Sequence, residues 1–195
     1  MLIACGALAK EIAGLRKLNG WDHIKIQCLP AELHNRPEKI PQAVRVEIEE
    51  SRAMFEHIFV AYADCGTGGA LDKVLDEFGI DRLPGAHCYE FFAGSDSFMQ
   101  IAEEEPGTFY LTDFLTRHFD RLVRKGLGLD RHPELMSQYF GNYRQLVYLS
   151  QSTSSELEDA ARKHADYLGL AYSHRHTGLA LIEGNIKEQV VQWRN

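Results

Sequence analysis

Residues 58–72 read IFVAYADCGTGGALD, and this stretch decides the fold class. Its apolar run ends at Asp64 and Cys65, turns through three glycines and resumes with apolar residues at helical spacing, which predicts a strand, a tight loop and a helix. Cys65 therefore lies at the carboxyl end of a predicted strand. Ligands of open α/β sheets bind at that edge, because loops and helix N-termini line a crevice there.

The same alternation of strand and helix patterns continues on both sides of this stretch. The predicted strands are 2–5, 23–29, 58–63, 108–112 and 145–149, and the main predicted helices are 8–18, 37–48, 71–78, 96–104 and 156–168. A tail over 170–186, which contains His174 and His176, is predicted to form a strand or hairpin. We expect an α/β protein with a mostly parallel sheet and helices on both faces, a Rossmann-like three-layer architecture.

Composition sets limits on size and partners. The 195 residues, of which 45% are hydrophobic and 25% charged, contain no low-complexity linker or repeat, so we expect a single α/β domain over 1–195. The net charge of -7 argues against nucleic acid as a partner. The chain has neither a basic n-region nor an apolar run of the roughly 18 residues that a membrane span needs. We therefore expect a cytoplasmic protein that does not bind membranes.

The four cysteines, Cys5, Cys28, Cys65 and Cys88, fall at or near the carboxyl ends of predicted strands, and Cys88 lies in a short aromatic-rich segment over 86–92. In a parallel sheet these ends share one edge, with neighbouring strands about 4.8 Å apart, so thiolates from adjacent strands can meet one metal ion. We expect Cys5, Cys65 and Cys88 to ligate a zinc ion or an iron-sulfur cluster, with His34 as the fourth ligand. The alternative is packing, because free cysteines are among the most buried residues and no CxxC pair occurs.

Cys65 also has a metal-free interpretation. A thiol at a strand-to-helix joint lies near backbone N–H groups and the positive end of the helix dipole, which lower its pKa and favour the thiolate. The run Cys65-Gly66-Thr67 is loosely similar to that of the cofactor-independent amino-acid racemases. Cys65 would then be the catalytic nucleophile or base of a racemase-like or hydrolase-like enzyme that acts on a small carboxylate.

The glycines after Cys65 have two interpretations. The N–H groups of Gly66, Gly68 and Gly69 could form a nest that binds an anionic group of a cofactor at the start of the helix. The run is neither GxGxxG nor a P-loop, and the other interpretation is a tight turn that needs positive φ.

Five motifs together resemble a known family. They are Cys5-Gly6-Ala7-Leu8, Leu33-His34-Asn35-Arg36-Pro37-Glu38, Tyr62-Ala63-Asp64-Cys65-Gly66-Thr67-Gly68-Gly69, Pro84-Gly85-Ala86-His87-Cys88-Tyr89-Glu90 and Glu105-Pro106-Gly107-Thr108-Phe109-Tyr110-Leu111-Thr112-Asp113-Phe114. Over nearly its whole length the chain is similar to the domain-of-unknown-function family 1638 of bacteria and archaea. The resemblance implies no activity, but members tend to be encoded near corrinoid-dependent methyltransferases. It therefore implies a setting in one-carbon methyl transfer, with a corrinoid as a further candidate cofactor and a methyltransferase or corrinoid protein as a candidate partner.

The sequence leaves open whether the chain is an enzyme. The leading hypothesis is a metal-binding or iron-sulfur protein that serves corrinoid-linked methyl transfer as catalyst or accessory. The second is the metal-free cysteine enzyme. The third is a module that binds a corrinoid or a partner protein without chemistry, in which the cysteines only pack.

Overall fold

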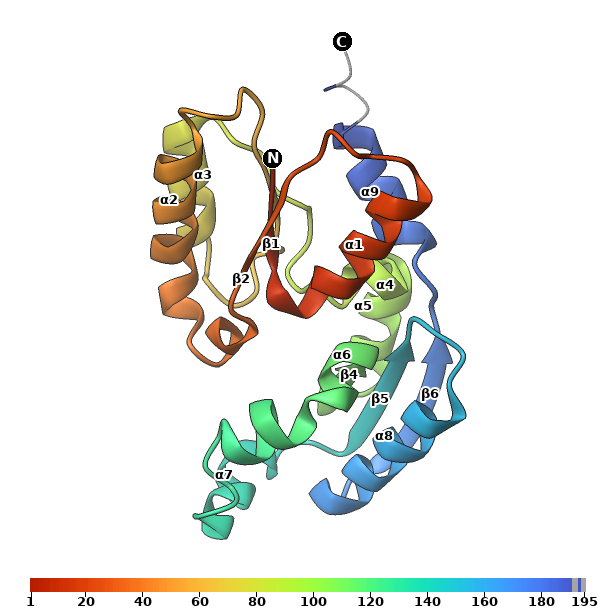
Figure 1. The fold of residues 1–195 in the computed structure, drawn as a ribbon. Helices are drawn as coiled ribbons and strands as arrows, with labels where there is room; N and C mark the ends of the chain where they lie inside the picture. Colours follow the sequence, from red (N-terminus) through yellow and green to blue (C-terminus); the bar gives the residue numbers. More distant parts are fainter. Residues whose placement is uncertain (191–192, 194–195) are drawn as a thin grey trace. The chain divides into compact units, whose positions relative to one another are not determined.

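The computed structural model describes residues 1–190 and Trp193, and its contacts divide the chain into two compact units (Figure 1). Unit 1 comprises Met1–Cys88 and the chain from Ile182 onward, and unit 2 comprises Tyr89–Leu181. Each unit contains one three-stranded sheet whose strands are all parallel. The expected α/β class with parallel strands is confirmed, and the strands are divided between two sheets. The single domain expected over 1–195 stays a prediction.

The sheet of unit 1 has the strand order β2-β1-β3. The central strand β1 (Leu2–Cys5) is apolar and buried throughout, as expected for a parallel strand with a neighbour on each side. It pairs with β2 (Ile26–Leu29) and β3 (Phe59–Ala61). The carboxyl ends of the three strands therefore lie at one edge of this sheet.

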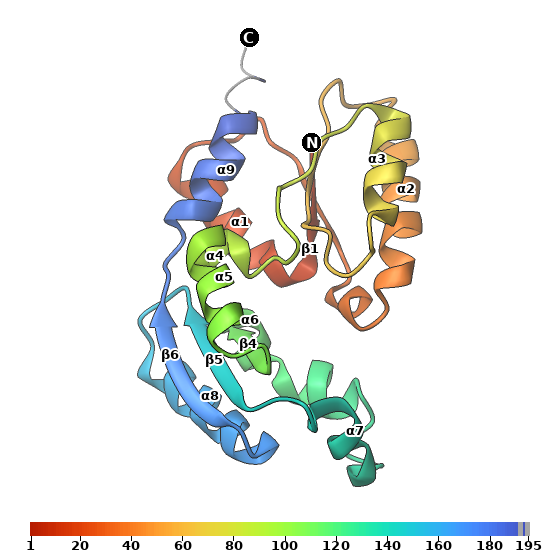
Figure 2. The same cartoon turned by 180° about the vertical axis from the view of Figure 1, so that it is seen from behind.

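Helices cover both faces of the unit 1 sheet. Their bounds are η1 (Gly6–Leu8), α1 (Ala9–Leu18), η2 (Ala31–Asn35), η3 (Pro37–Lys39), α2 (Ile40–Ser51), α3 (Ala70–Phe78) and α9 (Ala180–Val190), the last of which begins two residues before unit 1 resumes. Helices α2 and α3 lie together on one side of the sheet, and α1 lies on the other side (Figures 1 and 2). In α2 the buried residues Ile40, Val44 and Ile48 recur every four positions, so the helix turns one apolar stripe inward.

The sheet of unit 2 has the strand order β4-β5-β6. Its strands are β4 (Thr108–Thr112), β5 (Gln145–Ser150) and β6 (Ala171–His176). Its helices are α4 (Glu90–Ala93), α5 (Ser95–Glu104), α6 (Asp113–Arg117), the π-helical η4 (Asp120–Lys125), η5 (Pro133–Leu135), α7 (Met136–Phe140) and α8 (Ser155–Leu168). Parallel pairing sets Ser150 beside His176 at the carboxyl end of the sheet.

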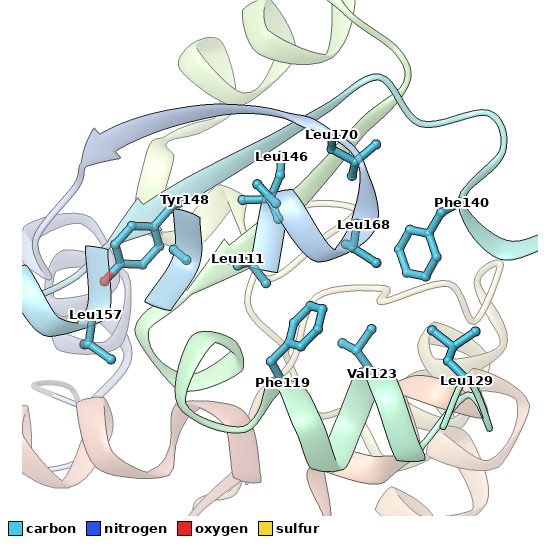
Figure 3. Packing of buried hydrophobic residues seen from close by; sticks show 12 residues of the cluster. Leu111, Phe119, Val123, Leu129, Phe140, Leu146, Tyr148, Leu157, Leu168 and Leu170 are labelled. Atoms are coloured by element: carbon cyan, nitrogen blue, oxygen red, sulfur yellow. The ribbon is translucent and has the colours of Figure 1, made fainter. Parts of the chain in front are cut away.

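Alternate residues of β5 enter two different cores of unit 2. Leu146 and Tyr148 belong to the larger core, which includes residues of α8 and η4 (Figure 3). Val147 and Leu149 pack with residues of α5 on the opposite face. Because side chains alternate along a strand, this division shows that both faces of the sheet are covered. The buried members of the larger core are Leu111, Phe119, Val123, Leu129, Phe140, Leu146, Tyr148, Leu157, Ala161, Ala165, Leu168 and Leu170.

Two segments differ from the sequence expectations. The aromatic run before Gly94 forms the short helix α4, so Cys88 lies in a turn and does not follow a strand. The tail contains the expected strand β6, but α9 follows it where a hairpin was the alternative. Along the described part of the chain, every helix is too short or too polar to cross a bilayer.

Candidate metal centre

Cys65 lies in the loop that connects β3 to α3. Its φ of +50° makes it the one residue other than glycine with positive φ in the described part of the chain. The N–H of Cys65 donates to the carbonyl of Ala86 at 2.9 Å, and the N–H of Asp64 donates to that of Gly85 at 3.2 Å. These bonds tie the loop to the segment that carries Cys88. A positive φ at a residue with a side chain costs about 1 kcal/mol or more, and such strain is typical of functional sites.

The glycine turn after Cys65 is closed by the carboxylate of Asp64. Its oxygens accept hydrogen bonds from the Thr67 hydroxyl at 2.6 Å and from the N–H groups of Gly68 and Gly69 at 3.1 and 2.8 Å. Burial alone would raise the pKa of Asp64, but these hydrogen bonds lower it. Gly68 and Gly69 have φ values of +62° and +80°, as the tight-turn interpretation requires. The predicted cofactor nest of Gly66, Gly68 and Gly69 stays a prediction, and two of its three donors already bind Asp64.

Cys5 and His34 meet where the first two strands end. The Cys5 Sγ lies 3.4 Å from His34 Nδ1 and accepts the N–H of Ala7 at 3.3 Å. A side chain at Gly6 would approach the carbonyl oxygen of Leu29 to 2.8 Å, so glycine permits the close contact between η1 and the end of β2. This contact places Cys5 beside the short helix η2 that carries His34.

The ligand atoms of His34, Cys65 and Cys88 all lie within 4.8 Å of one another. The Nε2 of His34 is 3.9 Å from the Cys88 Sγ. Two sulfurs that bind one zinc ion, each at about 2.3 Å, lie about 3.8 Å apart. Small shifts of the side chains would therefore let all three atoms bind the same ion. Cys65 is buried, and His34 and Cys88 are half-buried.

The hydrogen bond between Cys65 and Cys88 shifts the pKa values of the two thiols in opposite directions. A hydrogen bond from Cys88, together with His34, outweighs burial and lowers the pKa of Cys65. The same hydrogen bond, followed by burial, raises the pKa of Cys88. Burial lowers the pKa of His34, but the hydrogen bonds and charges of Cys5 and Cys65 outweigh it and raise the pKa. When no metal is bound, the lowered pKa of Cys65 favours its thiolate and the raised pKa of His34 favours its imidazolium.

Sequence reasoning missed Tyr62, which lies between β3 and Cys65. Its ring stacks on that of His34, with centroids 6.4 Å apart and planes 18° from parallel. Its hydroxyl is buried near Cys5 but forms no hydrogen bond of normal geometry with the described residues. Burial, then the charge of Cys5, raises the pKa of Tyr62 and keeps the hydroxyl protonated. A tyrosine inside an apolar strand run was the available signal.

The structure brings three of the four predicted metal ligands together in one group. His34, Cys65 and Cys88 form the compact group, and Cys5 contacts His34 without being a member of it. Cys28, which the sequence ranked last, is exposed and lies outside the group. Whether any of them binds a metal, and whether Cys65 is catalytic, stay predictions.

The histidines of the tail belong to unit 2 and satisfy a buried serine. The hydroxyl of Ser150 lies 2.9 Å from His174 Nε2 and 3.0 Å from His176 Nδ1. Glu158 is 3.7 Å from the other ring nitrogen of His174. Ser150 is fully buried, so this network provides hydrogen-bond partners that its hydroxyl needs.

Comparison with known proteins identifies a family to which the chain is similar. A family described as "Protein of unknown function (DUF1638)" matches residues 28–186, a range that includes His34, Cys65 and Cys88. No curated protein and no solved structure matches the chain.

Proposed function

Because the chain belongs to the DUF1638 family, whose description names no activity, we propose a function from the site itself: binding of a metal ion by His34, Cys65 and Cys88. The observation that carries this proposal is the convergence of their three ligand atoms within 4.8 Å, from three separate segments of unit 1. Thiolate and imidazole are the ligands that zinc prefers in proteins.

The number of ligands indicates what such a metal would do. Structural zinc sites are closed by four protein ligands, whereas catalytic sites have three and keep a fourth position for water or substrate. The group in unit 1 has three members, so a metal with four ligands would keep its fourth position for water or substrate. A bound zinc ion would act as a Lewis acid that ionises a ligand in the fourth position. An iron-sulfur cluster is the other candidate for the same thiolates.

We place this site, as a proposal, in corrinoid-linked one-carbon methyl transfer. The support is the resemblance of the sequence motifs to a family encoded beside corrinoid-dependent methyltransferases. In that setting a metal-activated nucleophile would be the methyl acceptor, and the chain would act as catalyst or as accessory to a methyltransferase. Consumption of methylcobalamin by the metal-loaded chain, followed by the absorbance of the corrinoid, separates the two roles.

Metal analysis of anaerobically purified chain tests the central proposal. We expect close to one zinc per chain, or iron with sulfide if a cluster is bound. In Cys65→Ser and Cys88→Ser the metal content should fall to a small fraction of the wild-type value, because each loses one of two thiolate ligands. Binding also displaces the proton of His34, whose pKa is raised, so the metal affinity should decrease as the pH falls.

Cys28→Ser is the matched control, because Cys28 is an exposed cysteine of the same unit outside the group. It should retain the full metal content. Wild-type chain without stoichiometric zinc, iron or cobalt, even after reconstitution under reducing conditions, would refute the proposal.

A metal-free cysteine enzyme is the second candidate. The observation that favours it is the lowered pKa of Cys65, which gives a thiolate beside a cationic His34. Such a pair is the arrangement of activated cysteine nucleophiles. The strained loop that presents Cys65 at the carboxyl edge of the sheet is compatible with this role.

A further inference from the structure

Cys5 contacts the metal-ligand group at one side of the His34 ring. Its sulfur lies 3.4 Å from Nδ1 of the ring, whereas Nε2, on the other side of the ring, lies 3.9 Å from Cys88. The described part of the chain contains one group of mutually close metal ligands, and Cys5 is not a member. The histidine ring therefore stands between Cys5 and Cys88.

An imidazole that binds a metal through one nitrogen carries a proton on the other. Ligating histidines almost always donate this second N–H to an acceptor, which fixes the tautomer and the orientation of the ring. If Nε2 of His34 faces the metal, then Nδ1–H donates to the Cys5 sulfur. That sulfur also accepts the N–H of Ala7. In this arrangement the Cys5 sulfur accepts two N–H donors and serves as the outer-shell acceptor of the His34 ring.

The backbone holds Cys5 in this position. It is the last residue of the central strand, pairs in register with Leu29 and is 1% exposed. Gly6 packs so closely on the end of β2 that even a Cβ would meet the Leu29 carbonyl at 2.8 Å. Movement of the Cys5 backbone toward the ligand group would require this packing to change.

We propose that Cys5 is a positioning residue that orients His34 and does not itself bind the metal. The inference rests on the proposed metal site and revises the sequence expectation of four protein ligands.

Cobalt(II) substitution of the full chain tests the role of Cys5, because sulfur-to-cobalt charge-transfer absorbance rises with the number of bound thiolates. We expect wild type, Cys5→Ser and the control Cys28→Ser to give equal absorbance per bound cobalt. Cys88→Ser should give about half of it in whatever fraction still binds cobalt, because one of two thiolates is lost.

The affinities add a readout that separates positioning from ligation. Cys5→Ala removes the acceptor for Nδ1–H and should weaken cobalt binding by about 10- to 100-fold, the usual loss for an outer-shell partner. The Cys5→Ser hydroxyl can still accept, so it should recover most of the affinity. Loss of about a third of the charge-transfer absorbance in Cys5→Ser would show three thiolates and overturn this inference alone. Wild-type chain that binds no cobalt would overturn the proposed metal site as well.

Discussion

In the metal-free site, the hydrogen bond between Cys65 and Cys88 gives the two thiols different pKa values. Cys88 donates to Cys65, and the bond lowers the pKa of Cys65 while it raises that of Cys88. His34 adds a positive charge beside the Cys65 sulfur. The lowered pKa of Cys65 favours its thiolate, and the raised pKa of Cys88 means that a metal which binds its sulfur must displace a proton.

The lowered pKa of Cys65 predicts that metal-free protein contains one thiolate at a pH where ordinary cysteines are still protonated. A pH titration of the ultraviolet thiolate absorbance should show one thiol that ionises well below the ordinary cysteine pKa of about 8.5. Because the pKa of Cys65 is depressed in the folded chain, the thiolate is present above its folded pKa and disappears as the pH falls through it. Cys65→Ser should remove this step.

Two variants make the titration specific. Cys28→Ser should keep the low-pH step, because burial and the charge of Cys5 raise the pKa of Cys28. His34→Gln should move the step toward higher pH, since it removes the cation beside Cys65. A wild-type titration with every thiol at or above the ordinary value would count against both the thiolate and the metal-free enzyme.

The sequence identified Cys65 and His34 as candidate site residues, but it did not predict the roles of Cys5 and Tyr62. An apolar run followed by Asp64-Cys65 and glycines identifies a strand-to-helix joint, because each of those residues has a local conformational preference. Whether Cys5 faces a metal or the ring of His34 depends on distances between segments that no local pattern encodes. Tyr62 was missed for the same reason.

At the scale of elements, the packing of η1 against the end of β2 holds the Cys5 side of the site. Gly6→Ala would set a Cβ 2.8 Å from the Leu29 carbonyl and 3.2 Å from the Ala31 nitrogen. Both are backbone atoms, so η1 must move. We expect a loss of about 1 to 3 kcal/mol in the free energy of unfolding, the usual cost of overpacking, measured by urea denaturation.

Gly14→Ala is the matched control within the same β-α unit. It lies in α1, and an added Cβ would have no neighbour within 4 Å. Alanine in a helix interior should stabilise the chain by about 0.5 to 1 kcal/mol relative to glycine. Equal effects of the two substitutions would show that the contact at Gly6 does not constrain the fold.

The elements that the sequence predicted correctly have strong local signals, and those that it missed do not. β5 and α8 are long and clearly patterned, and the structure has both. α9 contains Gly184 and Asn185, which lower helix propensity, although Ile182, Ile186 and Val190 are buried at helical spacing. That spacing was the available signal for α9.

At the scale of the whole molecule, strand pairing divides the strands between two separate sheets. β-α alternation predicts parallel strands, but it does not determine which strands share a sheet, because pairing joins residues far apart in the sequence. In the structure β1 pairs with β2 and β3, and β5 pairs with β4 and β6. Each sheet has helices on both faces and an apolar core of its own.

This division predicts where metal binding stabilises the chain. All three proposed ligands lie in unit 1, and a ligand that binds only the folded state stabilises the part that must unfold to release it. Hydrogen exchange with and without zinc should therefore show slower exchange of core amides in β1 and β3, with little change in β4 and β5. Cys65→Ser should show no zinc effect in either unit, which controls for nonspecific metal binding. An equal zinc-dependent slowing in both sheets would show instead that residues 1–195 unfold as one cooperative domain.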